Sequence, residues 1–326
     1  MLILMRKVLL LAVIVPFGLV AQSSDLADVA GDLIFLSQQY ISPAADASTY
    51  QASSGWFTSA KKKKLWQVEV SVQGNWLLIP KDDRSFVVNE ANLINIGIQG
   101  EATVASIPTA LGGESDIVLE GQLDDETFEF DAPEGLNESY VNHYQMQVGV
   151  GLWHGTTLIG RFSPKIKIND TYYQVIGGGI QHSLSQWIPK LDASSFDVSA
   201  LVSYASYKVS DEFSDADLIL GTINSIDVDG DSFIFNLFAS KAISHFDISA
   251  GIGVNVSSFS YEIGGEGDVL LSVLNQSLTT LEGENTNFKA DLGINYNIKN
   301  FSINSMVTFG EYTNLLFGIN YNFNRD

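Results

Sequence analysis

The chain has 326 residues, with 38 acidic and 17 basic side chains, so its formal net charge is −21. Such a surface repels nucleic acid, whose binding needs a basic patch, so we expect no nucleic-acid partner. The sequence contains no cysteine, which excludes disulfides, thiolate metal sites and a lipid anchor on cysteine.

The first 21 residues have the pattern of a secretory signal peptide. Arg6 and Lys7 precede an uncharged apolar run over residues 8–20, and polar residues follow at once. The run is shorter than the roughly 20 apolar residues that a membrane-spanning helix needs. We therefore expect residues 1–21 to direct export and to be cleaved.

Residues 25–40 are predicted to form a short amphipathic helix. Apolar side chains recur there at helical spacing, and Ser42-Pro43 is a stop signal. An isolated apolar stripe needs a partner. We therefore expect residues 22–60 to plug the mouth of a barrel or to lie against its rim. The candidate plug residues are Leu33, Ile34, Phe35 and Tyr40.

Residues 61–326 alternate between apolar and small polar side chains with period two. The pattern is clearest near the C-terminus, where Phe288, Leu292 and Ile294 share one face and polar or glycine residues occupy the other. One apolar and one polar face suit a wall between lipid and a wet lumen. The sequence therefore predicts an all-β, antiparallel transmembrane β-barrel.

Eleven strand candidates can be counted in this region. They cover residues 65–79, 91–104, 143–153, 156–167, 172–184, 196–208, 232–243, 246–261, 288–298, 301–311 and 314–323. His154-Gly155, Ser244-His245 and Lys299-Asn300 are predicted periplasmic turns, so the acidic segments 209–231 and 262–286 face outward. An even strand number requires one more strand, for which residues 116–130 are the candidate. We predict about twelve strands, within a range of 10 to 14, and ten if the first pair lies outside the wall.

Period-two parity assigns a set of charged and amide side chains to the lumen. The predicted lumen-facing residues are Arg161, Lys165, Lys167, Asp247, Asn255, Asp291 and Asn295. These charges either form ion pairs that hold the wall in register or form a constriction that favours anionic solutes.

Residues 61–64 are four consecutive lysines directly before the first predicted strand. They form either a solvated turn at the membrane rim or a contact with anionic lipid headgroups, where each lysine adds roughly 1 kcal/mol. Trp66 and Trp153 fall near predicted strand ends, as aromatic residues at membrane interfaces do.

No sequence pattern indicates catalysis, a cofactor or a metal ion. Outer-membrane lipid hydrolases place His and Ser two residues apart on one strand, whereas Leu184 stands two residues after His182. The acidic residues 227–231 lack the glycine and glutamate positions of a calcium loop. We therefore expect neither enzyme activity nor a cofactor.

Four tracts carry a family resemblance. They are SGWFTSAK (residues 54–61), IPTALGG (107–113), RFSPKIKI (161–168) and GIQHSLSQWIP (179–189). They resemble an uncharacterised family of outer-membrane-type β-barrels from Gram-negative bacteria, which is distantly similar to long-chain fatty-acid transporters. The resemblance implies a barrel in the cell outer membrane and implies no functional residues. Two features depart from it: the lysine run, and an end at Phe323-Asn-Arg-Asp in place of a terminal aromatic residue.

Two functions follow from these predictions. The first is a passive channel or transporter for small hydrophobic or amphipathic solutes, with such a molecule as its ligand. The second is a structural or surface-interaction barrel with a closed lumen. The expected partners are outer-membrane lipid and, during biogenesis, the barrel-assembly machinery. Ordered side chains filling the lumen would favour the second function, and a continuous cavity with an apolar pocket near Leu33 would favour the first.

Overall fold

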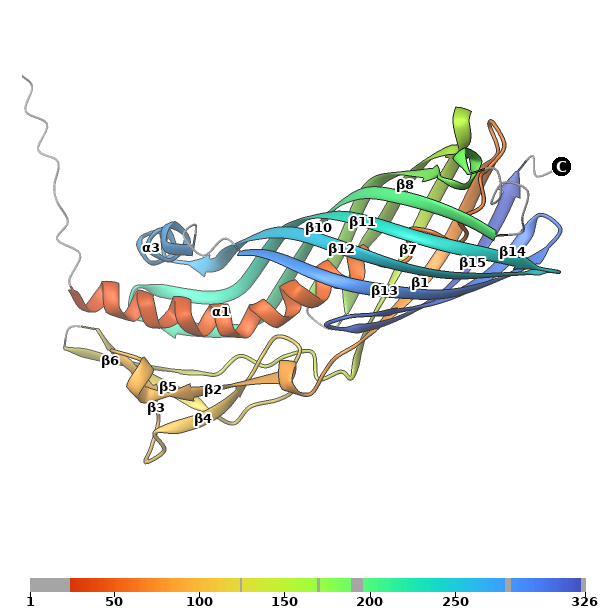
Figure 1. Cartoon of the computed structure of the whole chain (residues 1–326). Helices are drawn as coiled ribbons and strands as arrows, with labels where there is room; N and C mark the ends of the chain where they lie inside the picture. The colour runs from red at the N-terminus through yellow and green to blue at the C-terminus, as the bar shows by residue number, and fades with distance from the viewer. Residues whose placement is uncertain (1–23, 124, 169–170, 189–195, 279–282, 324–326) are drawn as a thin grey trace, which may run out of the picture.

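A computed structural model describes residues 24–123, 125–168, 171–188, 196–278 and 283–323. The predicted signal peptide lies outside the described residues. Within them, the chain forms a closed antiparallel barrel of ten strands and a long N-terminal helix, α1 (Ser24–Ser53), whose C-terminal end enters the barrel (Figure 1). Two small sheets and a second helix, α3 (Asp268–Leu278), lie beside one end of the barrel.

The ten barrel strands follow one another around the wall in chain order. They are β1 (Val68–Leu78), β7 (Tyr140–Gly151), β8 (Thr156–Ile168), β9 (Thr171–Ser183), β10 (Phe196–Leu218), β11 (Gly221–Ile243), β12 (Phe246–Glu266), β13 (Gly283–Ile298), β14 (Phe301–Phe309) and β15 (Thr313–Phe323). The barrel closes where β1 pairs with β15, from Val68 opposite Phe323 to Leu78 opposite Thr313.

The wall has ten strands and not the predicted twelve. Ten was the stated alternative, but its condition was wrong, because the first predicted strand, 65–79, belongs to the wall as β1. The predicted strands at 91–104 and 116–130 lie outside the wall. There, β3 (Ile96–Ile98), β5 (Val118–Leu123) and β6 (Glu126–Asp131) form one sheet, and β2 (Ser85–Asn89) pairs with β4 (Val104–Pro108). Strands of three to six residues are too short for the nine to eleven that a tilted wall strand needs.

The two ends of the barrel differ. At the turn end, the short connections at residues 154–155, 244–245 and 299–300 join neighbouring strands, as predicted. At the opposite loop end, β10, β11 and β12 continue beyond their neighbours as strands of 21 to 23 residues. The segments predicted as long outward loops, 209–231 and 262–286, are therefore mostly strand and helix in their described residues (Figure 1).

The elements at the loop end share one hydrophobic core, and we call them the head. The head comprises α1 up to residue 48, residues 79–139, the ends of β10 to β12, and α3. Its buried side chains include Leu26, Val29, Leu33 and Ile41 of α1, Val88, Ile96 and Leu119 of the small sheets, Ile223, Ile226 and Ile263 of the long strands, and Leu270 and Leu274 of α3. Asp32 joins α1 to β3 by accepting hydrogen bonds from the backbone N–H groups of Asn95 and Ile96.

Helix α1 continues past Ser42-Pro43 to Ser53, so the predicted stop at this position is wrong. Proline inside a helix costs about 3 kcal/mol. Ala44, Ala45 and Ala47 directly after it are buried, so tertiary packing and high helix propensity outweigh that cost. None of the helices in the described ranges is long and apolar enough to span a bilayer.

The outer face of the wall is an exposed apolar band. On β10 the outward side chains from Phe196 to Tyr204 are apolar, and on β12 those from Phe246 to Val256. Beyond these limits, toward the head, the outward positions become Ser, Lys, Asp and Glu. On these two strands the band therefore covers nine and eleven residues, which is the length that crosses the hydrocarbon core of a membrane when strands are tilted.

Candidate functional site

The lumen is filled by the last turn of α1 and the extended chain after it, residues 49–60, which we call the plug. Tyr50 at its loop end and Trp56 and Ala60 further down are all 0% exposed. After Ala60 the chain leaves the lumen at the turn end and continues into β1. The plug therefore runs along the barrel axis and separates its two ends.

Two buried cations hold the carbonyl end of α1. Arg161 of β8 donates through Nη1 to the carbonyls of Ala52, at 3.0 Å, and Ser54, at 2.8 Å. Its guanidinium also lies 3.9 Å from the ring centroid of Trp56. Lys289 of β13 donates to the carbonyl of Ser53 at 2.7 Å. We call Arg161 and Lys289 the clasp. A helix C-terminus has carbonyls without helical partners and a partial negative charge, so cations placed there stabilise it.

The clasp cations have partners in the wall. Arg161 also donates through Nε and Nη2 to Gln147 Oε1, at 3.2 and 2.9 Å. Lys289 pairs with Asp291 at 3.3 Å, and Asp291 accepts a hydrogen bond from Thr308 at 2.6 Å. Removing one member of such a buried pair typically costs about 3 to 5 kcal/mol, because the other charge is left without compensation.

Neutral contacts from several strands hold the rest of the plug. Phe57 stacks on Phe238 with ring centroids 3.9 Å apart. Hydrogen bonds join Gln147 to the carbonyl of Trp56, Gln181 to that of Ser59, Ser199 to that of Ala60, and the N–H of Ala60 to Ser240. The plug is thus bonded to opposite sides of the wall near the turn end as well as at the clasp.

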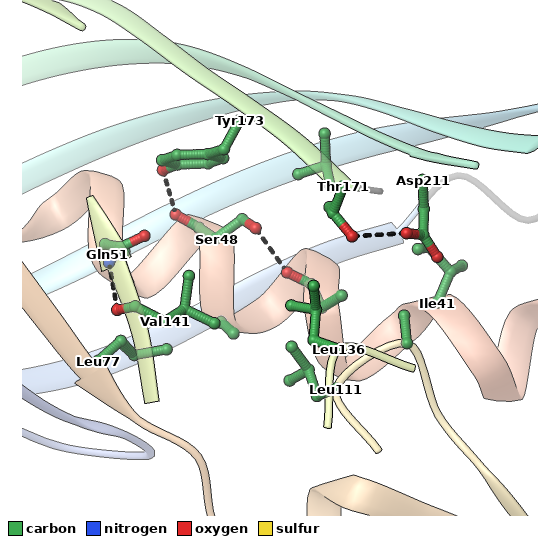
Figure 2. Close-up of a pocket in the computed structure, with 14 residues that line it drawn as sticks. Ile41, Ser48, Gln51, Leu77, Leu111, Leu136, Val141, Thr171, Tyr173 and Asp211 are labelled. Atoms are coloured by element: carbon green, nitrogen blue, oxygen red, sulfur yellow. Dashed lines mark hydrogen bonds between the residues drawn. The ribbon is translucent and has the colours of Figure 1, made fainter. Parts of the chain in front are cut away.

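A small cavity lies at the loop-end mouth, between α1 and the wall (Figure 2). Its volume is about 30 Å³, and Ile41, Leu77 and Leu136 are among its lining residues. Tyr173 donates to the carbonyl of Ser48 at 3.0 Å and closes one side. One water needs roughly 10 to 15 Å³ on this measure. The cavity therefore has room for two or three waters and none for a solute.

A second cavity lies inside the head. Its volume is about 60 Å³, and its lining is mainly apolar, from Leu33 and Leu36 of α1 to Phe130 and Phe213. A cavity of about 150 Å³ is known to accept benzene, so this one is smaller than a ligand site. The two cavities are lined by different residues and form no continuous path.

The lumen wall has more hydrogen-bonding groups than the plug and the neighbouring side chains satisfy. Several of its buried amide atoms have no hydrogen-bond partner among the described residues, namely Gln73 Nε2, Asn75 Nδ2, Asn236 Oδ1 and Nδ2, Asn255 Nδ2, Asn295 Oδ1 and Asn320 Oδ1. Buried polar atoms that lack a protein partner are normally met by ordered water. The wall is therefore chemically suited to a hydrated interior.

The predicted lumen residues divide into two groups. Arg161, Asn255, Asp291 and Asn295 are buried inside the barrel, and Asp247 is buried near the turn end. Lys165 and Lys167 are exposed instead, with their ammonium groups 4.1 and 5.0 Å from the ring centroid of Tyr172. The register of β8 shifts between Ser163 and Ile166, which ends the period-two parity on which their prediction depended. These two lysines therefore do not join Arg161 in a basic row.

The predicted plug residues lie in the head and not in the lumen. Leu33 and Tyr40 are buried there, and Ile34 and Phe35 are half-buried. The hydroxyl of Tyr40 donates to Asp211 Oδ2 at 2.7 Å. Burial, and next the negative charge of Asp211, raises the pKa of Tyr40 well above its ordinary value. The lumen is filled by residues 49–60, which lie beyond the predicted helix of residues 25–40 but within the predicted plug segment of residues 22–60.

The structure also brings together a histidine and a serine that the sequence analysis did not pair. His143 Nε2 of β7 is in hydrogen-bond contact with Ser163 Oγ of β8. A base beside a hydroxyl is the first requirement of nucleophilic catalysis. The two side chains are only 1% and 0% exposed, however, and neither lines the two cavities described above. The contact therefore gives no accessible active site.

In the described ranges, no group of three or more His, Asp or Glu side chains could hold a metal ion.

Comparison with known proteins identifies the family of the chain and finds solved structures of low similarity. Residues 3–323 match the model of a family of unknown function, DUF6588. The chain belongs to this family. Among curated proteins none matches it.

Solved structures that resemble the chain are bacterial membrane proteins of low similarity. The translocator domain of the autotransporter NalP from Neisseria meningitidis has 11% identity and a TM-score of 0.35, covering 88% of this chain and 99% of its own. The attachment invasion locus protein Ail of Yersinia pestis has 9% identity and a TM-score of 0.28, covering 80% and 100%. The outer membrane protease OmpT of Escherichia coli has 8% identity and a TM-score of 0.30, covering 83% and 100%. TM-scores this low support no inference about function. The distant similarity to fatty-acid transporters stays a prediction.

Proposed function

We propose that the protein is an outer-membrane β-barrel that anchors the head at the cell surface and whose lumen is closed by its own plug. One observation carries this proposal: the plug is tethered at both ends. On one side it continues through residues 61–67 into β1. On the other side α1 is buried in the head core through Leu26, Val29 and Leu33. Leaving the lumen would therefore require the head core to come apart.

The exposed apolar band and the difference between the two ends support the membrane placement. Short turns face the periplasm and longer segments face outward in bacterial barrels. The head then lies outside, where residues 79–139 alone carry 14 acidic and two basic side chains. Outer-membrane lipid is the partner of the band, and the barrel-assembly machinery is the partner during insertion.

The head is the working part in this proposal. It contains the apolar core of the molecule, whereas the barrel interior is lined largely by Ser, Thr, Asn and Gln. Strands β10 to β12 extend the wall outward and cover α1. A closed barrel that carries an ordered head outside the membrane is suited to contacts with molecules at the cell surface.

Passive transport of small hydrophobic or amphipathic solutes is the second candidate function. The polar atoms of the lumen wall without protein partners favour it, because a hydrated lumen would satisfy them. The apolar cavity near Leu33 lies in the position expected for such a solute, but at about 60 Å³ it would have to widen to accept one. In this alternative the plug is a gate, and the clasp residues Arg161 and Lys289 hold it closed.

Single-channel conductance in planar bilayers separates the two functions. The refolded full chain is expected to be silent, with and without added fatty acid, and to show the heat-modifiable gel migration of a folded barrel. A variant with Arg161→Gln and Lys289→Gln loosens the plug and is expected to give irregular openings. Regular conductance steps from the unaltered protein would overturn the closed-lumen proposal and establish the plug as a natural gate.

A further inference from the structure

The strongest concentration of basic charge lies at the turn end, opposite the acidic head. Four of the 17 basic residues are consecutive, at positions 61–64, where the chain leaves the lumen and crosses the rim toward β1. Lys61, Lys62 and Lys64 are exposed. Lys63 is half-buried and pairs with Glu69 at 3.1 Å.

This lysine tract has a fixed position beside β7. The N–H of Trp66 donates to the carbonyl of Gly151, and the N–H of Gly151 donates to that of Gln67, both at 2.8 Å. The N–H of Lys64 donates to Gln67 Oε1 at 3.0 Å. A side chain at Gly151 would overlap the carbonyl oxygen of Lys64, so the glycine permits this close approach. Because the backbone is already ordered, binding a ligand here costs little additional entropy.

Exposed tryptophans lie beside the tract. Trp66 and Trp153 contact each other edge to face with ring centroids 5.4 Å apart, and they are 54% and 58% exposed. Tryptophan side chains of membrane proteins concentrate at the level of the lipid headgroups. The neighbouring lysines are therefore at the depth of the lipid phosphates.

We propose that Lys61, Lys62 and Lys64, together with Trp66 and Trp153, form a binding site for the headgroup of an anionic phospholipid. The site rests on the proposed membrane placement and goes beyond it by naming a lipid class. Lysine ammonium groups near an anionic leaflet attract its phosphates. The head, with its excess of carboxylates, repels the same lipid, so the anionic headgroup is selected at the turn-end rim.

Competition between lipids tests the site. The full chain is inserted into nanodiscs containing equal amounts of phosphatidylglycerol and phosphatidylcholine, released into mild detergent, and analysed by native mass spectrometry for retained lipid. The unaltered protein is expected to retain phosphatidylglycerol preferentially. In the variant with Lys61→Gln, Lys62→Gln and Lys64→Gln, the ratio of retained phosphatidylglycerol to phosphatidylcholine is expected to fall by about tenfold or more.

A charge-matched variant is the control. Lys165→Gln, Lys167→Gln and Lys208→Gln remove the same charge from exposed positions at the loop end. This variant is expected to keep the preference. A second measurement needs no variant: raising the ionic strength should reduce the preference of the unaltered protein, because salt screens exposed charges.

Three outcomes would overturn the lipid site. They are no preference in the unaltered protein, an equal loss in both variants, and a preference that does not respond to ionic strength. Failure of the underlying membrane placement gives a different result, because the protein then fails to insert and lacks heat-modifiable migration even in phosphatidylcholine alone.

Discussion

The carboxyl group of Asp46 is the clearest case of a single residue in an unfavourable environment. It lies on α1 at the loop-end mouth, above the apolar band. Burial, and next the charge of Glu311, raises the pKa of Asp46 to about 6 from 3.8, although the amide of Asn285 donates to it. The folded state therefore binds this proton more tightly than the unfolded state does. The resulting stabilisation is fully present below about pH 4 and is lost as the pH rises through 6.

We predict that Asp46→Asn stabilises the protein at pH 8, by about 1 to 3 kcal/mol, because it removes a charge that burial opposes. At pH 4 the carboxyl group is already protonated in the folded state, so little change is expected. Urea unfolding followed by tryptophan fluorescence at both pH values measures the effect. Asp125→Asn removes a charge from an exposed turn and is the control. Equal stabilisation at both pH values would contradict the assignment of the effect to ionised Asp46.

Residue roles were predictable where they depended only on parity along one strand. Arg161 and Asp291 occupy interior positions because β8 before its bulge and β13 keep period two. The contact between His143 and Ser163 depends on the register in which β7 pairs with β8. The sequence of either strand alone does not determine that register. The carbonyl partners of the clasp could not be predicted either. Residues 22–60 were expected to plug the mouth or to lie against its rim, but the sequence does not determine which of their backbone groups meet Arg161 and Lys289.

At the scale of elements, the apolar residues of β10, β11 and β12 change from the outward to the inward face of the strand, and this change marks where the wall ends. In β10 the apolar side chains face outward up to Tyr204, and beyond it Tyr207 and Val209 face inward. The same change of parity occurs in β11 between Phe233 and Val228. In the proposed membrane placement, lipid covers the outward apolar face of the band, whereas in the head α1 covers the inward apolar face. The alternation was recognised from the sequence, but its change of face was not, so these strands were predicted too short.

The end of α1 inside the lumen depends on Gly55. Its φ is +73°, a conformation that favours glycine after a helix C-terminus. A Cβ atom there would overlap the side chain of Leu316. We predict that Gly55→Ala lowers the temperature at which the barrel unfolds in heat-modifiable gel migration, with a cost of about 1 to 3 kcal/mol.

The matched control for this change is Gly160→Ala on β8, where an added Cβ meets nothing within 4 Å. This variant should migrate and unfold as the unaltered protein does. If both alanine variants unfold at the same temperature, the plug does not have the tight fit at Gly55 that the structure gives it.

At the scale of the whole molecule, the direction of α1 constrains how the barrel is assembled. The helix starts in the head, at the loop end, and reaches β1 only after passing along the lumen to the turn end (Figure 1). The head comprises two sheets and two helices in addition to the long strands. It cannot pass through a lumen that the plug already fills. In the proposed membrane placement, residues 24–60 must therefore cross the membrane before the head folds and before β1 and β15 close the wall.

This order of assembly places the start of α1 on the same side of the membrane as the loops. We predict that an epitope inserted at Ser24 is labelled by antibody on intact cells. An epitope in the β10–β11 turn at residues 219–220 should be labelled as well, whereas one at Ser244-His245 should require permeabilised cells. Labelling of the Ser24 epitope only after permeabilisation, with the 219–220 epitope accessible, would mean that α1 does not thread the barrel. Since the head core is built on α1, it would also mean that the head is assembled differently in cells.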